Sequence, residues 1–188
     1  MLHSKRIVSA AQIALSIVFL TYSLSEKALA AMHEVRLADI STMIDHDGAQ
    51  AVVRKLYAQS DTWDAVLKKI GTGADGWVQI GIALHDQADG AEREMLEESF
   101  GEALGRKPAV LLELASQGKL KTEEFCIGPD VDDERYSSYA TASRALNRRI
   151  TAVRAVNEDA LRPYRNSCLE ALRSEEQHLH RFFDGSGE

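Results

Sequence analysis

The chain has 188 residues, a formal net charge of −7, a hydrophobic share of 45% and a charged share of 27%. These values are ordinary for a globular protein, and the length leaves room for one domain, or one domain with an appendage. An acidic chain is a poor candidate for binding nucleic acid or an anionic membrane face, because both need clustered Lys and Arg. The densest basic cluster is interpreted as a solvated helix face; it comprises Arg144, Arg148, Arg149 and Arg154.

The N-terminus has the three parts of a signal peptide. Lys5 and Arg6 form a small basic head, residues 13–20 are an apolar run, and a small-x-small pattern ends at Ala30. Signal peptidase recognises this arrangement. We therefore predict that residues 1–30 are removed by cleavage between Ala30 and Ala31.

Two alternatives remain for this segment. Residues 7–24 have about the minimum length for an uncleaved membrane anchor, although five polar residues dilute the run, and a cytosolic segment is the third possibility. Removal of residues 1–30, which hold three basic residues and one acidic residue, lowers the formal net charge from −7 to −9. The cleaved chain is expected to be periplasmic or secreted, without a membrane partner.

The sequence contains two cysteines, Cys126 and Cys168. In an oxidising compartment this number favours a single intramolecular disulfide. Two buried thiols, or a bridge between two chains, are the alternatives.

Apolar residues recur at helical spacing between residues 48 and 118, and no segment alternates strictly over the length of a strand. Asp47 is the expected N-cap of the first clear helix, Asp89 and Glu92 form a capping-box pattern, and Pro108 suits a first helical position. The expected helices cover about 48–59, 61–70, 75–86, 90–104 and 108–118; residues 31–47 form a short helix or a packed coil.

One apolar spacing occurs twice, fourteen residues apart, as Trp63, Val66, Ile70 and then Trp77, Ile80, Leu84. Both tryptophans are expected in the core. The sequence between the two stripes, Gly71-x-Gly73-x-x-Gly76, matches the dinucleotide-binding fingerprint. That fingerprint requires a preceding strand, whereas a helix is predicted here, so the glycines are interpreted as a turn.

The C-terminal part of the chain predicts longer helices, over about 133–183. If this region were one continuous helix, Cys168 would lie about 52 Å from Asp133, whereas the residues from Cys126 to Asp133 span at most about 24 Å. An intramolecular disulfide therefore requires a helical hairpin, with residues 120–133 folded back along it. The inward seam has a partly polar lining. It is expected to comprise Tyr139, Ser143, Leu146, Ile150, Val153 and Asn157, followed by Leu161, Tyr164, Cys168, Leu172, Glu175, Leu179 and Phe182.

The predicted fold is thus all-α. An array of short antiparallel helices, over about 48–118, packs on a longer hairpin, over about 133–183, which one disulfide ties. Residues 31–184 form a single domain, and residues 185–188 form a flexible tail.

No catalytic, cofactor-binding or metal-binding residue can be assigned from the sequence. Glu175-x-x-His178 resembles half of a di-metal site, but the second half is missing. The acidic groups around His46 and in the loop 130–134 lack the spacing of a calcium loop and are interpreted as helix caps. No cofactor is expected.

We expect a protein that acts by binding another protein, such as an inhibitor, an immunity factor or an assembly adaptor. The alternative is an enzyme or a metal- or ligand-binding helical bundle that uses acidic and histidine groups of the C-terminal half. An enzyme should gather several of His46, His85, His178, Glu175 and the loop 130–134 in one cleft. A binding protein should instead show a contiguous exposed patch.

Overall fold

The computed structural model describes residues 35–185, and all its regular elements are helical, with no strand in this range. The all-α prediction is confirmed. The described residues belong to one compact unit. The predicted cleavage between Ala30 and Ala31 and the alternative anchor over 7–24 lie outside the described residues, and so does most of the predicted tail.

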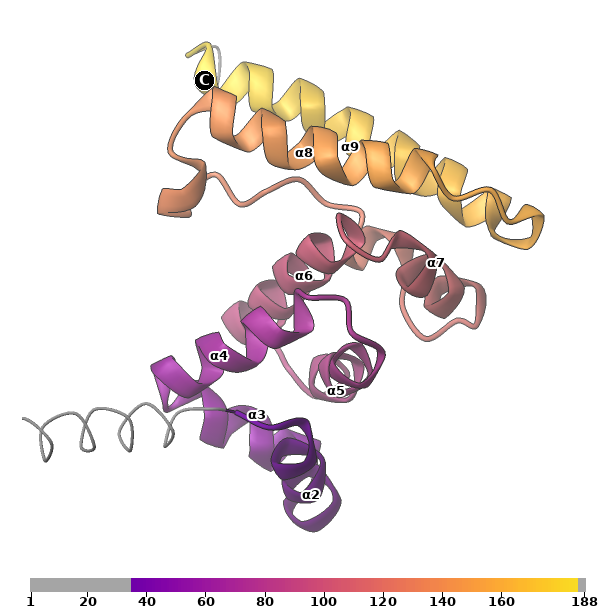
Figure 1. The fold of residues 1–188 in the computed structure, drawn as a ribbon. Helices are drawn as coiled ribbons and strands as arrows, with labels where there is room; N and C mark the ends of the chain where they lie inside the picture. The colour runs from indigo at the N-terminus through magenta and orange to yellow at the C-terminus, as the bar shows by residue number, and fades with distance from the viewer. Residues whose placement is uncertain (1–34, 186–188) are drawn as a thin grey trace, which may run out of the picture. The chain divides into compact units, whose positions relative to one another are not determined.

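The first part of the unit is an array of six helices joined by short turns (Figure 1). The turns hold one to four residues, the range that makes successive helices pack as neighbours. The helices are α2 (Leu37–Asp47), α3 (Ala49–Tyr57), α4 (Ser60–Ile70), α5 (Asp75–His85), α6 (Gly90–Leu104) and α7 (Pro108–Ser116).

The repeated apolar stripe packs into the array as expected, because α4 contacts α3, α5 and α6. Trp63 is 1% exposed, and its indole N–H donates to the Sδ of Met95 at 3.4 Å. Trp77 is only partly buried, so the core prediction is complete for one tryptophan and partial for the other. The glycines between the stripes form the α4–α5 turn, where Gly73 has a φ of +73° that favours glycine.

Two expected caps differ from the structure. Asp47 is the last residue of α2, and its carboxylate pairs with His46; the N-cap of α3 is Gly48, with a φ of +80°. The prediction failed because α2 extends farther than its weak apolar pattern indicated. Asp89 does occupy the N-cap position of α6, but its side chain makes no capping hydrogen bond.

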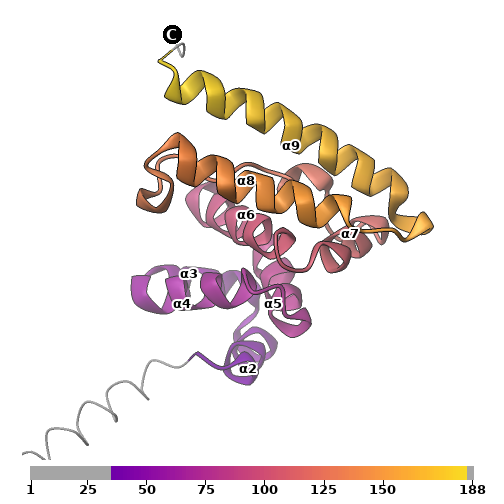
Figure 2. The same ribbon diagram turned by 45° about the horizontal axis from the view of Figure 1, so that its top comes forward.

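The C-terminal part is a helical hairpin, as predicted. After the short helices η1 (Thr122–Glu124) and η2 (Glu134–Tyr136) come α8 (Tyr139–Arg154), η3 (Asp159–Leu161) and α9 (Arg162–Phe183). Helices α8 and α9 run side by side in opposite directions (Figure 1). Helix α8 also contacts α6 and lies between α6 and α9, while α7 contacts both helices of the hairpin (Figure 2).

The seam of this hairpin matches the sequence pattern except at Asn157, which is exposed beyond the end of α8, and at the end of α9. Leu146, Ile150 and Val153 of α8 are buried, as are Cys168, Leu172 and Leu179 of α9. Phe182 is 47% exposed instead of buried. Phe183 lies against the core instead, with its ring centroid 6.2 Å from that of Tyr139.

Candidate functional site

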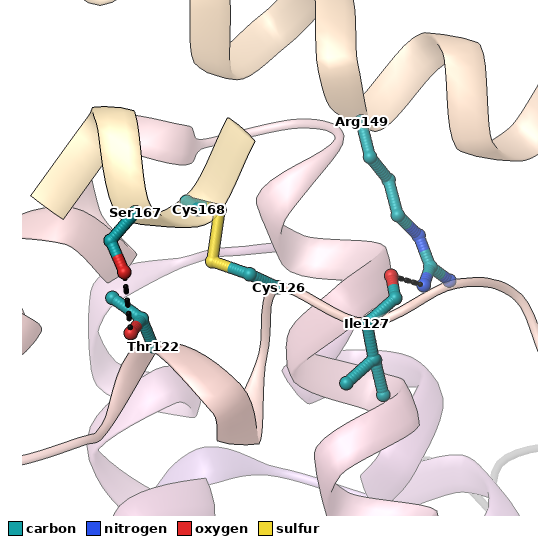
Figure 3. The surroundings of a disulfide bond; sticks show 6 residues. All are labelled: Thr122, Cys126, Ile127, Arg149, Ser167 and Cys168. Atoms are coloured by element: carbon teal, nitrogen blue, oxygen red, sulfur yellow. Dashed lines mark hydrogen bonds between the residues drawn. A yellow bond between two sulfur atoms is a disulfide. The ribbon is translucent and has the colours of Figure 1, made fainter. Parts of the chain in front are cut away.

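The single disulfide joins the connection after α7 to helix α9. Cys126 and Cys168 are bonded with a Cα–Cα distance of 5.2 Å, which confirms the predicted bridge. The Thr122 and Ser167 hydroxyls, 3.4 Å apart, reinforce the same junction (Figure 3). Residues 120–133 therefore fold back along the hairpin, as the geometric argument required.

A buried arginine binds the segment that follows Cys126. Arg149 of α8 is 2% exposed, although the sequence placed it on a solvated face. Its Nη1 donates to the backbone carbonyls of Ile127 (2.8 Å) and Gly128 (2.7 Å), and its Nη2 donates to Glu98 Oε1 at 2.8 Å (Figure 3 shows the bond to Ile127). The guanidinium thus fastens α8 to α6 and to the segment beside the disulfide.

Glu98 is the counterion of Arg149. Burial raises the pKa of the Glu98 carboxyl above its ordinary value, and this effect exceeds the opposing influence of the Arg149 charge and hydrogen bond. Desolvation disfavours the charged form of any carboxyl group. The pair is therefore a buried ion pair whose acidic partner ionises less readily than a free glutamate.

A pocket of about 130 Å³ opens where α6, η2 and α8 meet. Glu102 lies in its wall and accepts hydrogen bonds from two other wall residues, Arg106 and Arg135. The Nε–H of Arg135 also donates a hydrogen bond to Asp133 Oδ2 at 2.8 Å. Arg148 lines the same pocket and has neither a hydrogen bond nor an ion pair with any residue from 35 to 185.

Tyr136 supplies the remaining polar group of the pocket wall. Its ring lies under the guanidinium of Arg135, 5.2 Å from centroid to Cζ. Burial raises the pKa of the Tyr136 phenol, and the Glu102 and Glu98 carboxylates raise it further. The phenol therefore stays protonated and able to donate a hydrogen bond at neutral pH.

A second, larger hollow lies between α2 and α5. It has a volume of about 450 Å³ and a mostly apolar wall. Gly76 leaves room for the side chain of Leu37 against α5, because a Cβ there would lie 2.6 Å from the Cδ2 of Leu37. Leu37 is also one of the few large apolar side chains that are exposed (38%). Other wall residues are Ala38, Ile44, Ile80 and Ala83.

The groups that an enzyme was expected to gather are dispersed. His46 is exposed at the end of α2, and His178 is exposed on α9. His85 is buried on α5, with its Nε2 3.0 Å from Glu97 Oε1. Glu175 packs against Gly128, beside the disulfide segment. Within residues 35–185, no three His, Cys, Asp or Glu side chains gather so that they could hold a metal ion.

The acidic loop has a local structural role. Asp133 caps η2 by accepting the backbone N–H of Arg135 at 2.7 Å, and Asp130 accepts the N–H of Asp132 at 3.0 Å. The capping interpretation is thus confirmed for Asp133. It is wrong for the acidic residues around His46, which lie in the last turn of α2, and no side chain caps the following helix α3.

Sequence reasoning missed the arginine pocket and the apolar groove. One signal for the buried arginine was present, since Arg149 lies three residues after Leu146 and four before Val153, on the buried stripe of α8. The partners of Arg149 come from α6 and from residues 127–128. Their proximity depends on tertiary packing, which the local pattern does not encode.

Within residues 35–185 no helix has the length and apolar character required to cross a bilayer. The disulfide is consistent with an oxidising, extracellular compartment. No family model, curated protein or solved structure matches the chain.

Proposed function

We propose that this chain is an exported helical protein that works by binding another protein, as an inhibitor, an immunity factor or an assembly adaptor. The observation that carries the proposal is the apolar groove between α2 and α5. An exposed hollow with apolar walls is typical of a surface that receives apolar side chains of a partner. Export to the periplasm or the extracellular space is supported by the N-terminal signal pattern and by the disulfide.

The charges around the groove indicate the chemistry of the partner. Asp45, Asp75 and Asp86 are exposed and lie within one helical turn of groove residues. The nearest basic residue in sequence, Arg36, is paired with Asp39 through two hydrogen bonds of 2.8 Å. An acidic rim around an apolar floor favours an amphipathic segment with apolar anchors and basic flanks.

The proposal is tested by adding an arginine to the groove, with the Ala38→Arg variant. Ala38 is the second residue of α2, is exposed and lines the groove, so the long cationic side chain should block apolar anchors and repel basic flanks. The matched control is Ala140→Arg, because Ala140 is the exposed second residue of α8 and lies outside both pockets. Both variants should retain the helical content and unfolding midpoint of the native protein.

The partner is first isolated by affinity capture of the exported protein with mass spectrometry, and its affinity is then measured by calorimetry. We expect Ala38→Arg to weaken binding by at least about tenfold, the range for losing a central anchor contact, while Ala140→Arg leaves it unchanged. Equal affinity of both variants would contradict the groove as the recognition surface. A native dimer that Ala38→Arg converts to a monomer would instead assign the groove to a second copy, which would also contradict the proposal.

A further inference from the structure

The pocket of about 130 Å³ between α6, η2 and α8 has a separate chemical character from the apolar groove. Four of its wall residues are arginines, namely Arg106, Arg135, Arg148 and Arg149. Such a concentration is notable in a chain with a formal net charge of −7. Guanidinium groups provide several N–H donors in a planar fork that matches carboxylate and phosphate oxygens.

Three of these arginines are already neutralised by carboxylates. Glu102 accepts hydrogen bonds from Arg106 and Arg135, Asp133 binds Arg135 as well, and Glu98 pairs with Arg149. Both carboxylate oxygens of Glu102 accept a hydrogen bond, Oε2 from Arg106 and Oε1 from Arg135. The fourth guanidinium, that of Arg148, has no carboxylate partner among residues 35–185. The pocket thus keeps one positive charge that no acid of the described chain satisfies.

One further donor is available at this pocket, since the guanidinium of Arg149 already donates to Ile127, Gly128 and Glu98. The Tyr136 hydroxyl accepts and donates no bond within the described chain, and its raised pKa keeps it a donor.

The fold holds Arg148 at the mouth of the pocket. Helix α8 presents Arg148 next to the buried Arg149, and its side chain passes over Gly105, where a Cβ would lie 3.8 Å from the Cδ of Arg148. A volume of about 130 Å³ is well above the space that one water needs. A small polyatomic anion therefore has room beside Arg148 and Tyr136.

We propose that this pocket is a binding site for one oxyanion group, a carboxylate or a phosphate, with Arg148 as its principal partner and the Tyr136 hydroxyl as an additional donor. The site is independent of the apolar groove, so either proposal can fail without the other. A small acid, or an acidic group on a larger molecule, is the expected class of ligand. Two charge-assisted hydrogen bonds of ordinary strength correspond to a Kd of about 1 mM.

The test is a titration of the purified protein with inorganic phosphate and, separately, with succinate, at pH 7 and low ionic strength. Binding is followed through the amide chemical shifts of Gly105 and Arg149 in a ¹H–¹⁵N NMR spectrum. Saturable shifts with one probe but not the other would identify the oxyanion as a phosphate or a carboxylate. Added chloride should weaken the binding, because it screens the attraction.

Three variants decide the role of the residues. We expect Arg148→Ala to weaken binding about tenfold, as for loss of a charge-assisted hydrogen bond. Arg144→Ala, one turn earlier on α8 and also exposed, should leave binding unchanged because Arg144 does not line the pocket. Glu102→Gln should strengthen binding about threefold, because it removes a competing negative charge and releases Arg106 and Arg135 towards the anion.

The Glu102→Gln variant keeps the test decisive, since a gain in affinity cannot result from a loss of folding. Absence of saturable shifts with both probes would overturn the proposal. Equal weakening by Arg148→Ala and Arg144→Ala would overturn it as well, because that result describes a diffuse basic helix face. Weaker binding in Glu102→Gln would likewise contradict the proposed arrangement of charges.

Discussion

At the scale of single residues, the dominant feature is the Glu98–Arg149 pair. A buried ion pair contributes little net stability unless its remaining donors are satisfied, since both charges leave water. Here the backbone carbonyls of Ile127 and Gly128 accept two further hydrogen bonds from Arg149. The pair therefore acts as a fastening between three segments that have no sequence proximity.

The raised pKa of Glu98 predicts a pH-dependent stability. The folded protein binds this proton more tightly than the unfolded chain, so the contribution of Glu98 is greatest below its ordinary pKa and declines as the pH rises through the raised value. We expect the free energy of unfolding of the native protein, minus that of Glu98→Gln, to decrease as the pH rises from 4 towards neutrality, because only the native protein loses stability when Glu98 ionises. Urea denaturation at several pH values measures it.

The control for this prediction is Glu94→Gln, one turn earlier on α6, where the glutamate is exposed. Its difference from the native protein should stay small and nearly constant with pH. If the native free energy of unfolding minus that of Glu98→Gln instead increases with pH, the Arg149 charge, and not burial, has the larger effect on the pKa of Glu98.

Residue-level prediction from the sequence succeeded where a side chain had one plausible environment. Trp63 and the two cysteines are buried, as their types indicated. Arg149 was assigned to a solvated face because arginine is rarely buried without a partner, and Glu98, its partner, is 51 residues away. Phe183 lies against the core in place of the predicted Phe182, because neighbouring residues of a helix differ by only 100° in direction.

At the scale of elements, two glycines of the α6 region serve different purposes. A Cβ at Gly101 would lie 2.7 Å from the Nη1 of Arg149 and 3.0 Å from its Cζ. The nearest atom to a Cβ at Gly105 is 3.5 Å away, an ordinary contact. Helix α6 therefore needs glycine at the first position so that the guanidinium can pass, whereas the second position tolerates a side chain.

This contrast predicts opposite effects of the same substitution. Gly101→Ala should lower the free energy of unfolding by at least about 2 kcal/mol, because Arg149 must leave some of its partners. Gly105→Ala should raise it by about 0.5 kcal/mol, since alanine reduces the entropy of the unfolded chain at a φ of −67°. Urea denaturation of both variants checks the pair, and a stabilising Gly101→Ala would show that the guanidinium moves freely.

The helices themselves were largely predictable, because their apolar stripes and turn residues are local signals. The hairpin followed from the reach of the chain between Cys126 and the second long helix, an argument from covalent geometry. The groove was not predictable, because it depends on how α2 meets α5 around Gly76. Helix α2 contributes little to the core, with Ile40 as its one buried residue.

At the scale of the whole described unit, one core unites the array and the hairpin. Buried residues from α2 to α9 belong to a single cluster. The disulfide joins two parts of this core, since Cys126 follows the array and Cys168 lies within α9. Packing and the covalent bridge thus act on the same junction, which the sequence indicated through its cysteine count and apolar seam.

The bridge closes a loop of 42 residues. A loop of this length lowers the entropy of the unfolded chain enough to stabilise the fold by about 4 kcal/mol. We expect the double variant Cys126→Ala, Cys168→Ala to lose about that free energy of unfolding, measured with urea. The native protein treated with a reductant should show a similar loss, and a change below about 1 kcal/mol in both would mean that the unfolded chain is already compact.

The bridge between Cys126 and Cys168 also bears on biogenesis. These are the only cysteines of the sequence, so one intramolecular pairing exists and no incorrect one can compete with it. Maturation then requires a thiol oxidant but no isomerase to rearrange mispaired sulfurs. The bond also forms late in synthesis, because the Cys168 sulfur is not available until the turn between α8 and α9 has been made.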